Sequence, residues 1–280
     1  MKTGLIDIGG GERGIYGAGI MDRLDEEGIV FNVAIGVSAG SANLSSFLSR
    51  QRGRNRRFYT VYSLRDDYMS RKNIRDKGYY IDLNYAYGTL SCSRGEDPLD
   101  YRVFIASPTE FVAVATAAES GKVRYFTKEQ MKEDDFSVLM ASSALPGASR
   151  PYEVEGDLYF DGAVSDPVPV AKALEMGCDR IVLICNSPLS EAHDDKEDLR
   201  MARRMKKSYP AIAETLYRKG KIYDESLALA GKLAEEGRLL LLAPDDSCGV
   251  DVLCRSAKAM NDLYAVGYED GRKVAAFLFR

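Results

Sequence analysis

Two short apolar runs open this chain, at residues 3–8 (TGLIDI) and 32–37 (NVAIGV), and each is followed by small residues and then by a helical pattern. Short apolar runs of this kind are typical of buried strands. Gly28 follows the first helical pattern, in the place of a C-cap. The order strand, helix, strand, helix favours an α/β fold built on a parallel sheet.

The pattern is less regular between residues 50 and 100, where five arginines at positions 50–57 are followed by a dense run of tyrosines. We expect an insertion of helices and loops that crosses the top of the sheet. Regular structure returns after this insertion. The sequence predicts regular segments at 102–107, 110–117 and 122–126, a helix around 128–141, a hairpin with its turn at Glu155-Gly156, a helix from Pro167 to Gly177, and strands at 180–185 and 238–244, with helices in the remainder.

Composition excludes several classes of protein. The chain has 38 basic and 42 acidic residues, whereas a general nucleic-acid binder should carry a basic excess. Its five cysteines show no C-x-x-C spacing and it has one histidine, which argues for reduced thiols and against a zinc site. No secretory signal and no uncharged apolar run of about 18 residues is present, so we expect a cytoplasmic protein.

The pentapeptide Gly36-Val37-Ser38-Ala39-Gly40 has the pattern G-x-S-x-G and stands between a predicted strand and a predicted helix. In this pattern the serine occupies a sharp, strained turn, and the flanking glycines let strand and helix approach closely. The helix N-terminus also favours negative charge beside the serine. Because such a pentapeptide also arises by chance, the strand–turn–helix context carries the argument that Ser38 is a nucleophile.

The segment Gly9-Gly10-Gly11-Glu12-Arg13-Gly14 also lies between a strand and a helix, and it satisfies G-x-G-x-x-G. A dinucleotide site would need an acidic residue at the end of the second strand, but that strand ends in GVSAG. One alternative is an oxyanion hole built from glycine N–H groups. The other is a glycine turn that serves only close packing.

A serine hydroxyl needs a neighbouring base. The one histidine, His193, lies in the polar stretch SEAHDDKED, which reads as a solvated loop and is a poor place for a preorganised base. Asp161, in Asp161-Gly162-Ala163 after a predicted strand, is a candidate, although Asp-Gly alone usually marks a turn. An ordinary aspartate is a weak base at neutral pH, so its surroundings would have to tune it.

Taken together and in this order, GGGERG at 9–14, GVSAG at 36–40 and DGA at 161–163 resemble the patatin-like phospholipase family. That family pairs a G-G-G-x-R/K-G loop, a G-x-S-x-G elbow and a D-G-G/A motif. The resemblance covers residues 4–185, and the C-terminal third looks like that of bacterial members. It implies a three-layer α/β/α fold with a mostly parallel sheet, in a single domain 1–280 whose part from about 190 to 280 is mainly helical.

The resemblance also implies roles for individual residues. Ser38 would be the nucleophile and Asp161 the general base of a Ser–Asp dyad that cleaves lipid acyl esters through an acyl-enzyme, with no metal or organic cofactor. Gly9, Gly10 and Gly11 would form the oxyanion hole. Arg13 and Gly14 would lie in the same loop, and Arg13 would stabilise either the loop or an anionic substrate. The motif residues around the dyad would be Gly36, Gly40, Gly162 and Ala163. Many members have asparagine where this chain has Asp166, which puts local hydrogen bonding in question.

Two other functions stay open from the sequence. The first is an esterase or thioesterase acting on soluble acyl substrates, and the second is a nucleotide-binding or regulatory protein that uses GGGERG. The arginines at 50–57 and the tyrosines after them could form a lipid-facing lid with peripheral membrane contact, or an ordinary solvated helix face. The expected partner is a lipid or other acyl ester, not a nucleic acid, and the sequence indicates no oligomeric state.

Overall fold

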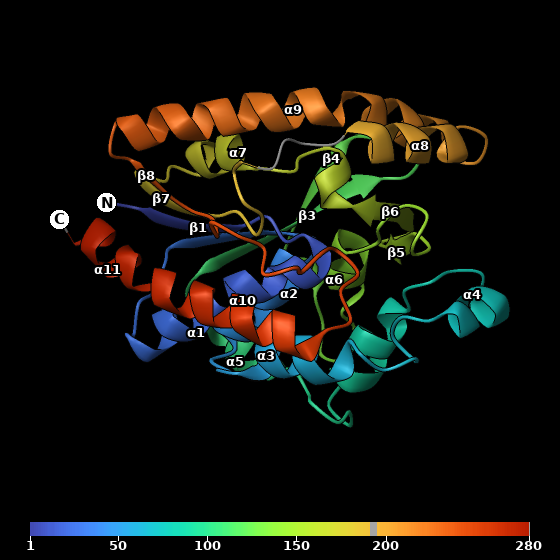
Figure 1. Ribbon diagram of the computed structural model, residues 1–280, viewed down its shortest axis with the longest axis horizontal. Coiled ribbons are helices and arrows are strands. Elements are labelled where there is room, and N and C mark those ends of the chain that lie inside the picture. The colour runs from blue at the N-terminus through green and yellow to red at the C-terminus, as the bar shows by residue number, and fades with distance from the viewer. Residues whose placement is uncertain (191–194, 280) are drawn as a thin grey trace.

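In the computed structural model, which describes residues 1–190 and 195–279, eight strands form one mostly parallel sheet between two layers of helices (Figure 1). The spatial order is β5-β6-β3-β2-β1-β7-β8, with β4 paired to β3 off this path. Strands β3, β2, β1, β7 and β8 run parallel, while β4 and β6 run antiparallel to β3. The strands are β1 (Thr3–Asp7), β2 (Val33–Val37), β3 (Glu110–Ala117), β4 (Val123–Thr127), β5 (Tyr152–Val154), β6 (Asp157–Asp161), β7 (Arg180–Ile184) and β8 (Leu239–Leu242).

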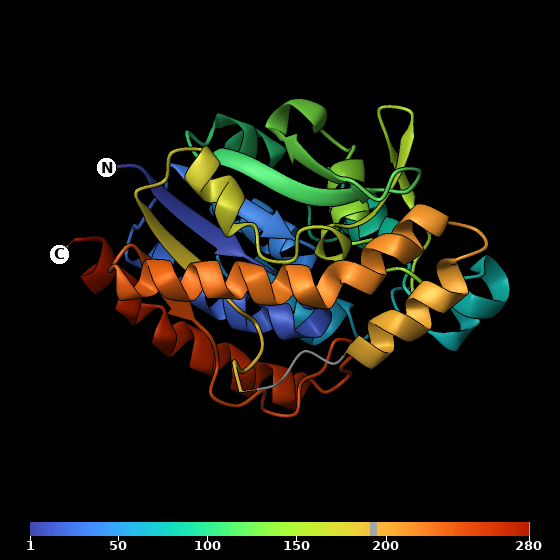
Figure 2. The same cartoon turned by 90° about the horizontal axis from the view of Figure 1, so that it is seen from above.

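Helices cover both faces of the sheet, as the three-layer prediction requires (Figures 1 and 2). On one face lie α7 (Val170–Glu175), α8 (Asp195–Met205) and the long α9 (Pro210–Glu235). On the other lie α1 (Ile15–Glu26), α2 (Ala39–Leu48), α3 (Arg54–Arg57), α5 (Tyr101–Ala106), α6 (Ser137–Ser142), α10 (Ala257–Asp270) and α11 (Arg272–Leu278), while α4 (Arg71–Lys77) projects to one side.

The buried side chains of the strands explain why both faces need cover. Successive residues of a strand point to opposite faces. In β1, Leu5 packs into the core beneath α1 and α10, and its neighbour Ile6 packs into the core beneath α9. Both residues are fully buried, so β1 is apolar on both sides, as expected for a central parallel strand.

The residues after position 190 complete the same sheet. Strand β8 pairs in parallel with β7 at the edge of the sheet, α9 covers one face and α10 packs against α1 on the other. The α1–α10 contact is close because it is built on glycines: a Cβ at Gly267 would overlap the carbonyl oxygen of Tyr16, and one at Gly19 would overlap the carbonyl oxygen of Tyr264.

The insertion between residues 50 and 100 is helical and irregular, as predicted. It includes two π-helical segments, η2 (Phe58–Tyr62) and η3 (Asn84–Leu90), which are rare and occur often near functional sites. Short 3₁₀ turns occupy η1 (Gly11–Gly14), η4 (Lys128–Gln130) and η5 (Gly162–Val164).

The prediction of one continuous helix around 128–141 is wrong. Only η4 and α6 are helical there, and the chain between them is irregular. Asp134 adopts φ +64° in this stretch, and its carboxylate accepts a 2.7 Å hydrogen bond from the Ser93 hydroxyl. The buried side chains of Met131 and Phe136 also anchor the segment to the core. Tertiary contacts therefore override the local helix preference.

Candidate active site

Ser38 occupies a strained turn between β2 and α2. Its φ and ψ are +55° and −131°, which is uncommon for a residue with a side chain. The glycines on either side permit the turn, because a Cβ at Gly36 would overlap Ser41 and a Cβ at Gly40 would overlap the backbone oxygen of Asp7. The local sequence therefore allows this sharp strand-to-helix turn, which the G-x-S-x-G pattern predicts.

Asp161 reaches Ser38 because two strands end opposite each other along one edge of β3. Val37, the last residue of β2, pairs with Val114, and Asp161, the last residue of β6, pairs with the next residue, Ala115. Strand β4 occupies the other edge of β3 at both positions, so β2 and β6 share one edge. Their carboxyl ends meet there, which brings Ser38 beside Asp161.

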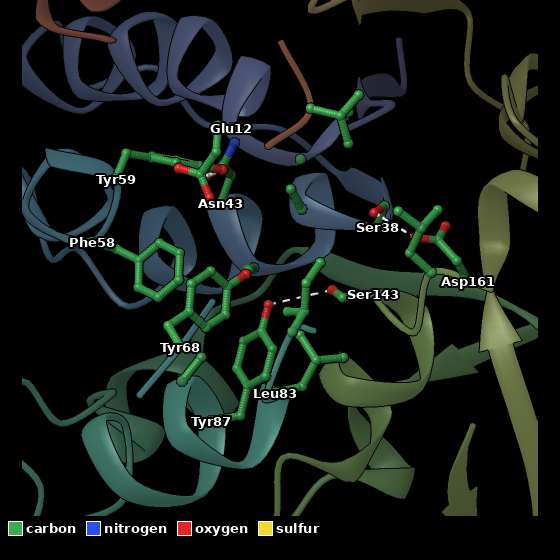
Figure 3. A pocket seen from close by; sticks show the side chains of 18 of the residues that line it. Glu12, Ser38, Asn43, Phe58, Tyr59, Tyr68, Leu83, Tyr87, Ser143 and Asp161 are labelled. Atoms are coloured by element: carbon green, nitrogen blue, oxygen red, sulfur yellow. Dashed lines mark hydrogen bonds between the residues drawn. The ribbon is translucent and has the colours of Figure 1, made fainter. Parts of the chain in front are cut away.

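The structure places the two side chains in direct contact (Figure 3). The Ser38 hydroxyl donates a 2.6 Å hydrogen bond to Oδ2 of Asp161. The other carboxylate oxygen, Oδ1, accepts a 2.8 Å bond from the backbone N–H of Ala163. Gly162 lies between them where a Cβ would overlap the carbonyl oxygen of Val114. The D-G-A motif thus orients the carboxylate and lets it approach β3.

Burial tunes the Asp161 carboxyl. Its side chain is 2% exposed, and desolvation raises its pKa to about 6. The hydrogen bonds from Ser38 and Ala163 and the positive charge of Lys219 act in the opposite direction. The carboxylate is therefore a stronger base than an ordinary aspartate but is still mainly ionised at neutral pH.

The glycine-rich loop lies against the Ser38 turn. Gly9, Gly10 and Gly11 all have positive φ, at +67°, +118° and +60°. A Cβ at Gly9 would overlap the carbonyl oxygen of Val37, so this glycine serves close packing. Its N–H donates a 2.9 Å bond to the Asp7 carboxylate. Gly10 and Gly11 line the cavity in front of Ser38. Gly10 is the N-cap of η1 and Gly11 is its first residue, where N–H groups lack intrahelical partners.

Ala39 is a further cavity residue that the sequence reasoning did not single out. It is the first residue of α2 and lines the cavity beside Ser38. N–H groups at this position have no intrahelical acceptor and carry the positive end of the helix dipole. The signal was present in the sequence, since Ala39 directly follows the serine of the elbow.

A buried polar network supports the glycine loop, and this network was not predicted from the sequence. Asp7 is fully buried and accepts bonds from Asn43 at 2.9 Å and from Asn186 at 2.6 Å. The side chain of Asn186 in turn accepts the N–H of Gly17 at 2.9 Å. Burial raises the pKa of Asp7, opposed by these bonds. Asp7 is the one acidic residue in the apolar run TGLIDI, and this position could have indicated the buried network from the sequence.

Arg13 and Gly14 lie in the loop but outside the cavity wall. The Arg13 guanidinium donates to the Ser187 hydroxyl at 2.9 Å and to the Val250 carbonyl at 3.2 Å. These contacts attach the loop to the segments after β7 and before α10, which corresponds to the loop-stabilising alternative for Arg13. Gly14 permits the close approach of Tyr59, whose hydroxyl oxygen would lie 2.5 Å from a Cβ at position 14.

Ser38 and Asp161 open onto a cavity of about 210 Å³ (Figure 3). Much of its wall is apolar, and the insertion supplies part of it through the π-helical segments that carry Tyr59 and Tyr87. The Tyr87 hydroxyl lies 3.3 Å from that of Ser143. Apolar wall residues include Ile8, Phe58, Met69, Ile81, Leu83 and Leu145.

The arginines at 50–57 are engaged within the protein. Arg50 and Arg52 pair with Asp25 and Glu26, and Arg54 and Arg57 pair with Asp97. The Arg56 side chain donates to Asn261 and lies over the ring of Tyr264. The lipid-facing lid therefore stays a prediction, and partners within the fold occupy the charges on which it relied.

Asp166 and His193 were also singled out from the sequence. Asp166 accepts a 2.7 Å bond from the Tyr125 hydroxyl and does not line the cavity, so it acts on the turn after Asp161 and not on the dyad itself. His193 lies outside the described residues.

Among the residues that are described, no helix is both long and apolar enough to cross a bilayer.

Comparison with known proteins identifies the family of this chain. The patatin-like phospholipase family matches residues 9–174, which contain all three motifs, and a domain of unknown function (DUF6363) matches residues 209–277. The uncharacterized protein YjjU of Escherichia coli is 31% identical over 193 residues, which cover 67% of this chain and 52% of that protein. The chain thus spans about half the length of this relative.

A second group of relatives and one solved structure are also similar to this chain. An uncharacterized NTE family protein of Mycobacterium tuberculosis is 32% identical over 77 residues, covering 28% of this chain and 20% of the relative. The crystal structure of VipD from Legionella pneumophila shares the fold, with a TM-score of 0.51 and 14% identity over 98% of this chain and 66% of VipD. The resemblance seen in the three motifs is confirmed: the chain belongs to the patatin-like phospholipase family.

Proposed function

We propose that this protein is a serine acyl hydrolase that cleaves lipid acyl esters through a Ser38–Asp161 dyad. The observation that carries the proposal is the 2.6 Å hydrogen bond from the Ser38 hydroxyl to the Asp161 carboxylate at the wall of a largely apolar cavity. A nucleophile held by a base within hydrogen-bond reach is the arrangement that acyl transfer requires.

In the first half of the reaction, Ser38 Oγ attacks the ester carbonyl carbon while its proton passes to Asp161. The carbonyl oxygen takes the negative charge, and the N–H groups of Gly10, Gly11 and Ala39 are the donors that would stabilise it. The tetrahedral intermediate then collapses, the bond to the alcohol oxygen breaks, and Asp161 returns the proton to the departing alcohol. The products are the free alcohol and an acyl group on Ser38.

In the second half, a water molecule replaces the alcohol. Asp161 accepts one proton from the water as its oxygen attacks the acyl carbon, and the same oxyanion donors act again. Collapse of this intermediate releases the carboxylic acid, and the proton on Asp161 restores the Ser38 hydroxyl. A carboxyl with a pKa of about 6 can accept and return a proton in this way near neutral pH.

The cavity indicates the scale of the group that enters it. An apolar cavity of about 150 Å³ can hold one benzene molecule. The cavity beside Ser38, at about 210 Å³, is somewhat larger. We therefore infer a preference for short to medium alkyl groups over long chains.

A second candidate is an esterase that acts on soluble acyl substrates. The observation that favours it is the pairing of four of the arginines at 50–57 with acids of the same chain, which offsets the positive charge that would attract lipid headgroups. Co-sedimentation with phosphatidylglycerol vesicles separates the two candidates. Binding by the wild type supports a membrane substrate, while its absence together with hydrolysis of soluble esters supports the second candidate.

The direct test of the dyad is labelling by a fluorophosphonate probe followed by peptide mapping. The probe reacts with activated serines, so we expect label on the peptide that contains Ser38. Ser38→Ala should lose the label and Ser120→Ala, at an exposed turn, should keep it. A folded wild-type protein that takes up no label, or takes it up at another serine, would refute the proposed nucleophile.

A further inference from the structure

Glu12 is a buried acid in the cavity wall that the acyl-transfer steps do not use. Its side chain is 2% exposed, and within residues 1–190 and 195–279 no hydrogen-bond partner meets its Oε2 atom. Figure 3 shows its carboxyl near Tyr59 and Asn43, apart from Ser38 and Asp161. A buried polar atom without a partner is costly, and Glu12 is one of the residues that line the cavity, so its carboxyl points to a ligand.

Three polar neighbours of Glu12, the side chains of Tyr59, Asn43 and Ser63, direct their protons to other acceptors. The Tyr59 hydroxyl donates to Oδ1 of Asn43 at 3.0 Å. The Asn43 amide donates to Asp7 at 2.9 Å and to a backbone carbonyl at 2.8 Å. The Ser63 hydroxyl donates to the carbonyl of Tyr59 at 2.7 Å. Within the described residues Oε2 of Glu12 is therefore left without a hydrogen-bond partner, and a group from outside the protein can supply one.

The environment of Glu12 favours the neutral acid. Desolvation raises its pKa to about 8, opposed by Ser63 and by the positive charge of Arg255, and assisted by Asp251. Tyr59 and Tyr68 also face it, and burial raises the pKa of both phenols, so they stay neutral. At neutral pH the Glu12 carboxyl can both donate and accept a hydrogen bond.

Arg54 is a buried cation on the cavity wall, and its guanidinium is engaged within the protein. The Arg54 guanidinium donates to the hydroxyls of Ser46 at 2.9 Å and Ser91 at 2.8 Å, and to the backbone carbonyl of Asp97 at 2.9 Å. An anionic ligand would therefore compete with these acceptors for Arg54 and would face a second acid at Glu12, beside Asp161. The chemistry that fits is a neutral group on an otherwise apolar chain.

We propose that Glu12 is a specificity-determining residue that binds a hydroxyl group carried by the alkyl part of the ester in the cavity. This inference rests on the proposed hydrolase function. A hydroxyl can accept a proton from the Glu12 acid or donate one to its carbonyl oxygen. An unsubstituted chain would leave the carboxyl buried and unpaired, and sites built to bind a hydroxyl reject the analogue that lacks it.

The hydroxyl can come from either side of the ester bond, and two series of substrates distinguish the sources. In the acyl series, p-nitrophenyl hexanoate is compared with p-nitrophenyl esters of hydroxyhexanoic acids in which the hydroxyl moves along the chain. In the alcohol series, methyl hexanoate is compared with glyceryl monohexanoate. We expect the wild type to prefer a hydroxylated ester in one series by roughly tenfold in kcat/KM, the effect of one hydrogen bond to a buried group.

Variants assign that preference to Glu12. Glu12→Gln keeps a neutral side chain with a donor and an acceptor and should retain the preference. Glu12→Leu should remove it by weakening the hydroxylated ester while leaving or improving hydrolysis of the unsubstituted one. Tyr87→Phe, which removes another hydroxyl from the same wall, is the matched control and should retain the preference.

Each outcome bears on the inference. Equal kcat/KM within both series for the wild type overturns it, even if Glu12→Leu does not fold. If Glu12→Leu lowers kcat/KM equally for the hydroxylated and the unsubstituted ester of a series, the inference is also overturned, because such a result shows that Glu12 has a structural role. Absence of hydrolysis in all series together with absence of label on Ser38 overturns the proposed function as well, whereas labelled Ser38 with unselective hydrolysis overturns the role of Glu12 alone.

Discussion

Val37 and Asp161 pair with consecutive residues on one edge of β3, Val114 and Ala115, although they are more than a hundred positions apart in the chain. One strand arrives parallel to β3 and the other antiparallel, so their carboxyl ends meet. The residue that follows Val37 is Ser38, whose hydroxyl bonds to Asp161. Sheet register therefore fixes the geometry of the proposed dyad.

Removing either member of the dyad should abolish hydrolysis. We expect Ser38→Ala and Asp161→Asn each to lower kcat/KM for a p-nitrophenyl acyl ester by about a thousandfold or more. Asp157→Asn, on the same strand but exposed, is the control and should keep full activity. Steady-state kinetics with circular dichroism of each variant gives the answer, and full activity in either dyad variant would disprove the mechanism.

Activity should depend on pH through Asp161. The carboxyl must be ionised to accept the serine proton, and its pKa is raised to about 6 by burial. We therefore expect kcat/KM to level off above about pH 7 and to fall about tenfold per pH unit well below pH 6. A pH–rate profile measures the midpoint, and a midpoint near 4, as for an ordinary aspartate, would contradict the tuning.

Two neighbouring glycines should respond differently to alanine. Gly9→Ala places a Cβ on the carbonyl oxygen of Val37, at a positive φ, and should cost more than about 3 kcal/mol of unfolding free energy. At Gly10 the nearest atom to a new Cβ is 3.8 Å away, so Gly10→Ala should cost only backbone strain, about 1–2 kcal/mol. Denaturant unfolding compares them, and equal losses would show that packing at Gly9 is not the cause.

Replacing Glu12 should change stability with a defined pH dependence. The folded state keeps the Glu12 proton up to a pKa of about 8, whereas the unfolded chain releases it near 4.5. The unfolded state therefore binds fewer protons between these values, and wild-type stability falls as pH rises through the window. Relative to the wild type, Glu12→Gln should gain up to about 5 kcal/mol from pH 4.5 to 8. A difference that does not change with pH, measured by denaturant unfolding, would exclude the raised pKa.

The helices after position 190 should be required for stability. Gly267→Ala would push a Cβ against the Tyr16 carbonyl between α10 and α1 and should cost about 3 kcal/mol or more. Gly231→Ala, within α9 where a Cβ meets nothing within 4 Å, is the matched control and should stabilise by about 0.5–1 kcal/mol. Thermal unfolding of both variants tests this, and no loss in Gly267→Ala would argue against a tight α1–α10 contact.

Local features were predictable from the sequence because the residues that require them are adjacent in the chain. The apolar runs predicted β1 and β2, Gly28 ends α1 with φ +67°, and Glu155-Gly156 turns the β5–β6 hairpin. The G-x-S-x-G spacing predicted the strained turn at Ser38. These features depend on backbone torsions and on apolar periodicity, which a short stretch of sequence determines.

Only the tertiary structure decided how distant segments meet. It placed Asp161 against Ser38, assigned the N–H of Gly9 to Asp7 and paired most of the arginines at 50–57 with acids of the same fold. It also buried Oε2 of Glu12 without a partner among the described residues. Burial and pairing depend on residues that are tens to hundreds of positions apart, so the type and spacing of neighbouring residues carry no record of them. The sequence thus determined which groups were available for chemistry, and the packed fold determined their partners and their protonation.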